Sequence, residues 1–170
     1  DEITLRDNHA VFQRVWLRPR VLVNVRNISM STKILGHHTS IPIYFTATAL
    51  GKLAHPDGEL AIIRAARARR IPYMLPTLSS YTLEEMLREC ASEQVFFGQL
   101  YVNSDRQKTL RYIKQLERGG CKGLFVTVDA PQLGRREKDM RNKFTQQGSD
   151  VQKDDEDAGK VGRDQGVSRA

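Results

Sequence analysis

Four apolar runs alternate along the chain with helical patterns, and this alternation constrains the fold more than any other feature. The runs have the length of strands and occupy residues 41–47, 71–75, 95–102 and 123–128. Their centres are roughly two to three dozen residues apart, which is the spacing of βα units. The sequence therefore predicts an α/β fold with a parallel sheet.

Helix signals stand between these runs. Asp57 precedes an amphipathic segment whose arginines form a separate, solvated face, Thr82 with Glu85 fits a capping box, and Asp105 opens a third helix. The glycine pair at residues 119–120 supplies the left-handed stop expected after a helix. We expect three helices, each leading into the next strand.

Single polar groups at the strand ends favour a (β/α)8 barrel over an open doubly wound sheet. No dinucleotide-type or Walker-type glycine loop follows any strand. In a barrel, side chains from several strand ends converge on one site. A closed barrel needs about 250 residues, so this chain predicts the N-terminal half, about four βα units. The polar residues at the strand ends are Thr48, Thr77, Gln99, Tyr101, Thr127 and Asp129.

The flanking segments differ from the predicted barrel units. Residues 5–35 are interpreted as an N-terminal extension packed against the domain, with an amphipathic piece at 11–16 and a β-like run at 21–25. After Phe144 the sequence is polar and carries an acidic run. The predicted organisation is a half-barrel domain over residues 1–144 and a mobile tail over residues 145–170.

Composition excludes several classes of protein. The chain is 39% hydrophobic and 28% charged, which is typical of a globular domain. Its net charge of +7 is spread along the sequence and aromatic residues are only 7%, which argues against nucleic-acid binding. The longest apolar runs are too short for a membrane helix. The N-terminus has no secretory or transit pattern.

Cys90 and Cys121 are expected to be buried, unpaired thiols.

Five segments of the sequence carry a family resemblance. They are DEITLRDNHAVFQRVWLRPRVLVNV, PIYFTATALGKLAHPDGE, QLYVNSDR, FVTVDAPQLGRREKDMRNKF and the terminal QGVSRA. In these segments the chain resembles the FMN-dependent L-2-hydroxy-acid oxidase and dehydrogenase family, and most closely its flavocytochrome-type L-lactate dehydrogenases. The resemblance implies a flavoprotein oxidoreductase that converts an L-2-hydroxy acid to the 2-oxo acid with FMN as cofactor. L-Lactate is the expected substrate.

The resemblance also implies which residues face the flavin. Ala47, Thr48 and Ala49 match the segment whose small side chains let the backbone approach the ring near its reactive nitrogen. Gln99 and Thr127 match the positions that hydrogen-bond the pyrimidine edge, which requires neutral donors and acceptors.

Catalytic and substrate-binding roles come from the same resemblance. Tyr101 matches the tyrosine whose hydroxyl faces the substrate, and Asp129 matches the carboxylate that pairs with a catalytic histidine. Arg136 matches an arginine that assists with substrate charge, and Leu78 occupies a position that helps to set substrate size. No metal is expected, because a third ligand beside the His37 and His38 pair is not evident.

Three departures from the family pattern bear on activity. Pro76 stands where the family usually has a serine in contact with the flavin, and proline lacks both the hydroxyl and the backbone N–H. The family tyrosine that binds the substrate carboxylate has no counterpart in this sequence. The second half of the family barrel supplies the flavin lysine, the catalytic histidine, the carboxylate-binding arginine and the phosphate loops. The chain alone is therefore expected to be inactive.

The expected partners and setting follow from the same resemblance. They are a small 2-hydroxy acid, a cytochrome-type electron acceptor, the missing C-terminal half-barrel and further copies of the complete protein in a homo-oligomer. The mitochondrial intermembrane space is implied, with the cytoplasm as the alternative. The chain would be a fragment, one piece of a nicked polypeptide or the product of a truncated gene. A second hypothesis is a catalytically dead half-barrel remnant that acts as a binding or assembly module.

Overall fold

The computed structural model describes residues 2–129 and 137–141. The chain divides into two compact units, one formed by residues 1–29 and 134–146 and the other by residues 30–133 and 147–170. The second unit carries the sheet and the candidate site. The predicted tail at residues 145–170 lies outside the described residues, and the predicted boundary at residue 144 stays a prediction.

Short helices form the regular part of the first unit. Helix α1 (Ile3–Ala10) continues into the 3-10 helix η1 (Val11–Gln13), and helix α5 (Glu137–Arg141) belongs to the same unit. The amphipathic piece predicted at residues 11–16 is therefore helical only as far as Gln13. The β-like run predicted at residues 21–25 is wrong, because the described backbone there forms no strand and turns where the Asn24 side chain accepts a hydrogen bond from the backbone two residues on. The packing of the extension stays a prediction.

A parallel sheet forms the centre of the second unit, as predicted. Its strands are β3 (Tyr73–Leu75), β4 (Phe96–Leu100) and β5 (Leu124–Val126), and they lie in the order β3-β4-β5. In the register of the sheet, Gln99 of β4 is paired with Phe125 of β5. Consecutive strands are parallel neighbours, so each connection between them has to cross over the sheet.

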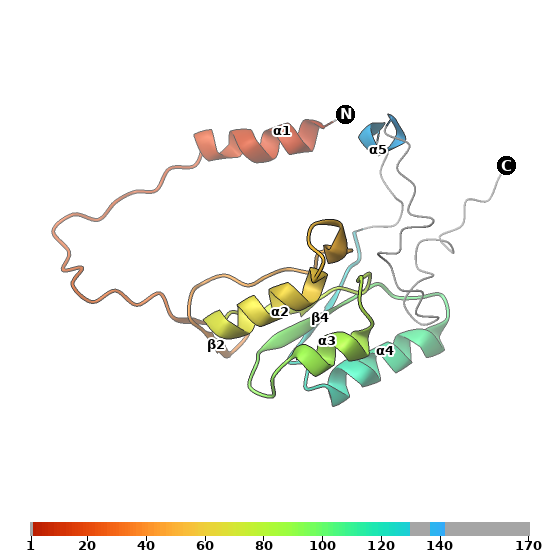
Figure 1. Cartoon of the computed structure of the whole chain (residues 1–170). Coiled ribbons are helices and arrows are strands. Elements are labelled where there is room, and N and C mark those ends of the chain that lie inside the picture. Colours follow the sequence, from red (N-terminus) through yellow and green to blue (C-terminus); the bar gives the residue numbers. More distant parts are fainter. Residues whose placement is uncertain (1, 130–136, 142–170) are drawn as a thin grey trace. The chain divides into compact units, whose positions relative to one another are not determined.

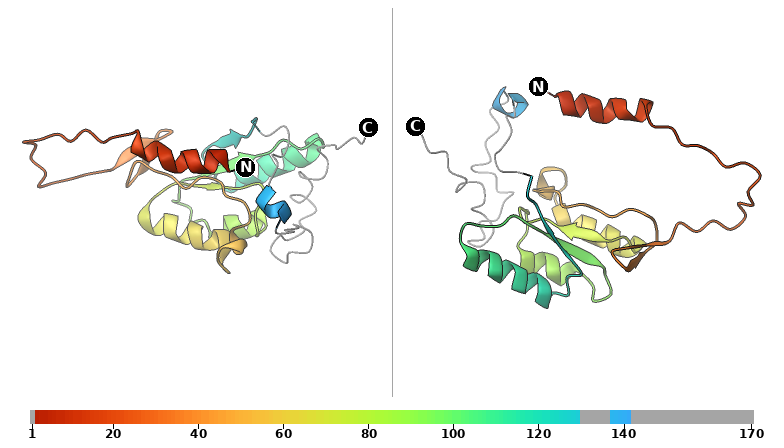
Figure 2. Two further views of the ribbon diagram at one scale, coloured as in Figure 1. Left: turned by 90° about the horizontal axis from the view of Figure 1, so that it is seen from above. Right: turned by 180° about the vertical axis from the view of Figure 1, so that it is seen from behind.

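The three predicted helices of this unit lie between successive strand positions. They are α2 (Gly58–Arg69), α3 (Leu83–Glu89) and α4 (Arg106–Arg118). Helices α3 and α4 lie in the two crossovers of the sheet, and α2 lies between the Phe45 segment and β3. All three lie side by side on one face of the sheet (Figure 1), and from behind the strands lie in front of them (Figure 2). The alternation confirms consecutive βα units.

The first predicted strand, at residues 41–47, is reduced to a single bridge. Phe45 pairs in parallel with Tyr73 at the outer edge of β3. Pro42 has no N–H to donate, and the N–H of Ile43 turns back to the carbonyl two residues before it at 2.9 Å. Phe45 still marks the place of a strand beside β3.

The predicted helix starts are confirmed. The Thr82 hydroxyl accepts from the Glu85 N–H at 3.1 Å and the Glu85 carboxylate accepts from the Thr82 N–H at 2.9 Å, which completes the capping box. Asp105 accepts a hydrogen bond from the backbone two residues on at 2.9 Å, and α2 begins directly after Asp57. Of the two glycines predicted to stop α4, only Gly120 is left-handed, with φ of 86°.

Arginines of α2 face solvent, as predicted, and also join α2 to α3. Arg64 is 48% exposed in its side chain and donates to both carboxylate oxygens of Glu89, at 3.0 and 3.2 Å. The hydrogen bond from the Arg64 guanidinium holds the pKa of Glu89 below its usual value. This two-point contact adds geometric specificity between α2 and α3 but contributes little stability, because the pair is solvated.

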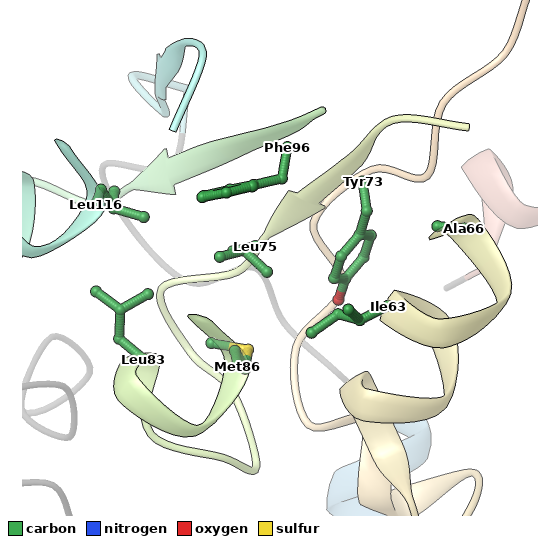
Figure 3. Packing of buried hydrophobic residues seen from close by; sticks show 8 residues of the cluster. All are labelled: Ile63, Ala66, Tyr73, Leu75, Leu83, Met86, Phe96 and Leu116. Carbon is green, nitrogen blue, oxygen red and sulfur yellow. The ribbon is translucent and has the colours of Figure 1, made fainter. Parts of the chain in front are cut away.

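The core lies between the sheet and the helices (Figure 3). Gly98 of β4 is needed for this packing, because a Cβ at that position would lie 2.4 Å from Cδ1 of Leu116. Helix α4 can therefore approach β4 closely. Figure 3 also shows the Tyr73 ring between β3 and α2, with its hydroxyl beside Ile63. The buried cluster consists of Ile63, Ala66, Tyr73, Leu75, Leu83, Met86, Phe96 and Leu116.

Aromatic rings pack on the opposite face of the sheet. Tyr44 lies 6.4 Å from both Phe97 and Phe125, and the last two rings are 5.6 Å apart between centroids. Phe97 is completely buried. Since successive side chains of β4 alternate between faces, Phe97 and Gln99 point to this side while Phe96 and Gly98 point to the helices.

An antiparallel hairpin precedes the sheet. It consists of β1 (Thr32–Ile34) and β2 (His37–Thr39), and both residues of its turn have positive φ, as two-residue hairpins require. The His37 ring lies 6.5 Å from that of Phe97. The hairpin therefore adds to the aromatic cluster.

Both cysteines are free and partly buried, which agrees with the expectation of unpaired thiols. Burial raises the pKa of Cys90 to about 11 and also raises that of Cys121. At neutral pH both side chains are therefore protonated and weakly nucleophilic.

This burial predicts the pH dependence of thiol chemistry. In the folded protein, the rate of alkylation of Cys90 by iodoacetamide should reach half its maximum near pH 11, because only the thiolate reacts. In urea the midpoint should fall to the ordinary value of about 8.5. Since the folded-state pKa is the higher one, stability decreases as pH rises through this window. Peptide mapping separates the two thiols, and a folded midpoint below 9 would contradict the burial of Cys90.

Candidate functional site

A cavity of about 530 Å³ lies where the strands of the sheet end. The segment around Phe45, the ends of all three strands and the loop after β3 contribute to its walls. The walls combine apolar side chains, such as Met74 and Phe125, with a few polar groups. Its volume is in the range of sites for small molecules and cofactors. Of the predicted site residues, those on its walls are Ala47, Ala49, Leu78, Gln99, Tyr101, Thr127 and Asp129.

A chain of hydrogen bonds connects the ends of the three strands beside this cavity. The Thr77 N–H donates to Oε1 of Gln99 at 2.9 Å, and Nε2 of Gln99 donates to Oγ1 of Thr127 at 2.9 Å. The backbone N–H can only donate, so it fixes which end of the Gln99 amide faces Thr127. Thr127 therefore acts as acceptor toward Gln99 and keeps its own hydroxyl hydrogen for a further partner.

Thr77 was predicted only as a polar strand end and was not assigned to the site. Its hydroxyl donates to the Gln99 carbonyl at 2.6 Å and accepts from the Tyr101 N–H at 3.2 Å. It is almost completely buried, with 6% exposure. One threonine thus positions two predicted site residues. The signal available in the sequence was its place at the end of a buried strand.

Tyr101 is half-buried on the cavity wall directly after β4. Among the described residues, none hydrogen-bonds its hydroxyl, while its backbone is held by Thr77. Next to it, the Tyr112 hydroxyl of α4 donates to the Gln99 carbonyl at 3.2 Å. Burial raises the pKa of Tyr112, so this hydroxyl remains a donor. The strand end at Tyr101 is therefore fixed both by the segment after β3 and by α4.

The segment at residues 47–49 is only partly in the cavity wall. Ala47 and Ala49 line the cavity, whereas Thr48 between them is exposed and does not. The methyl side chains leave the adjacent backbone accessible from the cavity. The predicted contact of Thr48 with a cofactor stays a prediction.

Charged residues are scarce on the described wall. Asp129 is exposed and follows β5. Arg136 lies outside the described residues, so its predicted role stays a prediction. No lysine or arginine is among the lining residues that the structure describes. These walls therefore suit a largely neutral group better than a phosphate.

This donor set fits the ring system of FMN. A flavin ring has broad apolar faces and one edge that carries carbonyl and N–H groups. The apolar walls with Met74 and Phe125 suit the faces, and the neutral groups of Gln99 and Thr127 suit the edge. Pro76 also lines the cavity and offers neither N–H nor hydroxyl, so one expected contact is absent at that position.

The histidines lie apart from this cavity. His37 and His38 are in β2, and His55 accepts from the Asp57 N–H at 3.1 Å through Nδ1. None of them is on the described wall. In residues 2–129 and 137–141, no three side chains of metal-ligating type come together. The helices in that same part of the chain are all too short or too polar to cross a bilayer.

Comparison with known proteins relates this site to a family. The family model described as FMN-dependent dehydrogenase matches residues 1–165. The chain belongs to the FMN-dependent dehydrogenase family. The fold agrees with this membership, since the parallel βα units correspond to part of the family's α/β flavin domain. The family resemblance and the partial (β/α)8 fold predicted from the sequence are thereby confirmed.

Individual relatives of the FMN-dependent dehydrogenase family support the same placement. The chain is 47% identical over 170 residues to an L-lactate dehydrogenase (cytochrome) of Wickerhamomyces anomalus. The aligned region covers 100% of this chain and 29% of the relative. It is 45% identical to a peroxisomal (S)-2-hydroxyacid oxidase of Arabidopsis thaliana over 85% of this chain and 39% of the relative.

A solved structure agrees in three dimensions. A flavocytochrome b2 variant superposes with a TM-score of 0.79 at 44% identity, covering 85% of this chain and 39% of that one. The chain thus spans well under half the length of the relatives it matches.

Proposed function

We propose that this chain forms the N-terminal half of the FMN-containing barrel of an L-2-hydroxy-acid dehydrogenase, with L-lactate as the expected substrate. The observation that carries the proposal is the hydrogen-bonded chain from Thr77 through Gln99 to Thr127 on the wall of one cavity, beside Tyr101. Relatives named as L-lactate dehydrogenase (cytochrome) and (S)-2-hydroxyacid oxidase support the class of substrate.

FMN bound in this cavity would accept the two electrons that a 2-hydroxy acid loses on becoming a 2-oxo acid. Thr127 would donate its free hydroxyl hydrogen to an acceptor on the polar edge of the ring, because its oxygen already accepts from Gln99. The second N–H of Gln99 is available at the same edge. Ala47 and Ala49 would let the backbone approach the ring.

The substrate would lie between this ring and the mouth of the cavity. Tyr101 would donate its hydroxyl to a substrate oxygen without adding charge. Leu78 would limit the size of the substrate side chain, and Arg136 would assist with the substrate charge. Asp129 would orient and stabilise the protonated form of a histidine base that the family resemblance places outside this chain.

The proposal includes further partners. The remaining half of the barrel has to supply the histidine, the flavin lysine and the phosphate site, so the chain alone is inactive. A cytochrome-type protein is the proposed electron acceptor, and the complete protein is proposed to assemble from several copies. The mitochondrial intermembrane space is the proposed location, with the cytoplasm as the alternative.

A complementation experiment tests the proposed function. Residues 1–170 are co-expressed with the C-terminal half of the barrel of the Wickerhamomyces anomalus relative, and the complex is assayed for bound flavin and for lactate-dependent reduction of cytochrome c. We expect a yellow, active complex, whereas the chain alone binds no flavin. The Gln99→Leu variant should form the same complex but bind FMN at least tenfold more weakly, roughly the effect of losing one hydrogen bond in a buried site.

One observation favours the second hypothesis, a catalytically dead binding or assembly module. Pro76 stands on the cavity wall and removes a donor and a hydroxyl from the expected flavin contacts. A stable but colourless complex in the same experiment would support this hypothesis and contradict the first. Failure of the two halves to associate would contradict both.

A further inference from the structure

Glu59, the second residue of α2, has an ionisable side chain and is nevertheless completely buried. It does not line the cavity. Its Oε1 accepts from the Gly51 N–H at 2.8 Å and from the Ser80 N–H at 3.0 Å. A buried carboxylate requires such charge-assisted hydrogen bonds, because desolvation of an unpaired charge is costly. Glu59 therefore joins two loops that are distant in sequence.

These two loops form adjacent parts of the cavity wall. Gly51 directly follows the segment that carries Ala47 and Ala49, and Ser80 follows Leu78 after β3. Additional bonds run between the loops, since the Lys52 N–H donates to the Ser80 hydroxyl at 3.1 Å and the backbones at positions 50 and 78 are joined at 3.4 Å. The Glu59 carboxylate is the group that both loops share.

The packing around Glu59 leaves little freedom. A Cβ at Gly51 would lie 2.9 Å from the Glu59 backbone nitrogen and 3.1 Å from its carboxylate carbon. The backbone before it is left-handed at Leu50, with φ of 56°, which a leucine adopts only when its surroundings enforce it. The loop thus lies directly on the start of α2.

The second oxygen of Glu59 is also enclosed by the fold. Oε2 of Glu59 and the hydroxyl of Tyr73 are both buried, and neither has a partner among the described residues. Burial raises the pKa of Tyr73, and the negative charge of Glu59 raises it further. Because Glu59 does not line the cavity, its hydrogen bonds from Gly51 and Ser80 hold protein backbone rather than a ligand.

We propose that Glu59 is a positioning residue that holds the loops at residues 47–51 and 78–80 together and thereby sets the shape of the cofactor-facing wall. This inference rests on the proposed function, because the wall is taken to contact FMN. Glu59 touches neither the cofactor nor the substrate in this scheme. Its effect reaches the site through the backbone of both loops.

The test compares four variants in the complete barrel made with the complementing half. Glu59→Leu removes the acceptor, Glu59→Gln keeps one carbonyl oxygen, and Gly51→Ala pushes the loop away while leaving the charge. Asp105→Ala removes a carboxylate cap that contacts neither loop and serves as the control. Two quantities are measured, namely hydrogen exchange at the Gly51 and Ser80 amides without FMN, and the Kd for FMN.

We expect both amides to exchange at least tenfold faster in Glu59→Leu and in Gly51→Ala, with Kd for FMN raised at least tenfold in both variants. Glu59→Gln should recover most of the protection and affinity, and Asp105→Ala should change neither. If Glu59→Leu does not fold, Gly51→Ala still separates the loop from an intact carboxylate.

Different outcomes overturn different statements. Unchanged exchange at both amides in Glu59→Leu and Gly51→Ala would overturn the anchoring by Glu59. Faster exchange with an unchanged Kd for FMN would show that the anchoring does not set the cofactor wall, and would also overturn the inference. If the unmodified complex binds no FMN, the proposed function fails, while hydrogen exchange still decides whether Glu59 holds the two loops.

Discussion

Replacement of Asp129 by asparagine should lower kcat of the complemented enzyme by about 10²- to 10⁴-fold, the range associated with loss of general acid–base catalysis. The amide keeps the size of the carboxylate but cannot stabilise a positively charged imidazole. The histidine base would therefore hold its proton less tightly, and the loss should appear in kcat more than in KM. Lactate oxidation followed over a range of pH measures both quantities.

The control for this prediction is Asp105→Asn. Asp105 also follows a strand of the sheet, but it caps α4 through a backbone N–H at 2.9 Å. Asparagine is an equally good residue at a helix N-terminus, so kcat should not change. Retention of more than a tenth of kcat in Asp129→Asn would contradict the role proposed for Asp129. Equal losses in both variants would indicate a general effect of removing a carboxylate.

Substitution of Phe97 by alanine should destabilise the second unit by about 3–5 kcal/mol, as for other fully buried phenylalanines. Phe97 is 0% exposed and contacts Tyr44, Phe125 and His37 through its ring. Its removal leaves a cavity beside β4 and also ends the edge contacts among the aromatic rings. Urea unfolding followed by tyrosine fluorescence or circular dichroism measures the change.

Phe12 provides a matched control, because the same substitution removes the same side chain from a position that is 80% exposed. Phe12→Ala should change the free energy of unfolding by less than about 0.5 kcal/mol. A loss below about 1 kcal/mol in Phe97→Ala would mean that the aromatic cluster does not belong to the stable part of the fold.

The local signals in the sequence predicted the helices well. The capping box of Thr82 and Glu85, and the cap at Asp105, depend only on residues within one turn, so a short stretch of sequence determines them. The strands at β3, β4 and β5 were also found, since each is an apolar run; β3 and β4 are buried, whereas β5 is partly exposed. The first strand was overestimated because Pro42 prevents a ladder that hydrophobicity alone would allow.

The candidate site could be predicted only in part. The polar groups at strand ends, above all Gln99 and Thr127, were identified because a parallel sheet gathers them at one edge. Thr77 and Glu59 were missed as residues that support the site, since each acts on a partner more than twenty residues away. Glu59 in particular has the sequence context of an exposed acid in the first turn of a helix.

The contact between Gly98 and Leu116 has a consequence for the divergence of related chains. Any side chain added at position 98 would meet Cδ1 of Leu116, so either the Leu116 side chain or α4 would have to move. A descendant of this sequence can accept a larger residue in the strand more easily once the facing position in the helix has become smaller. The two positions are therefore expected to change together in related chains.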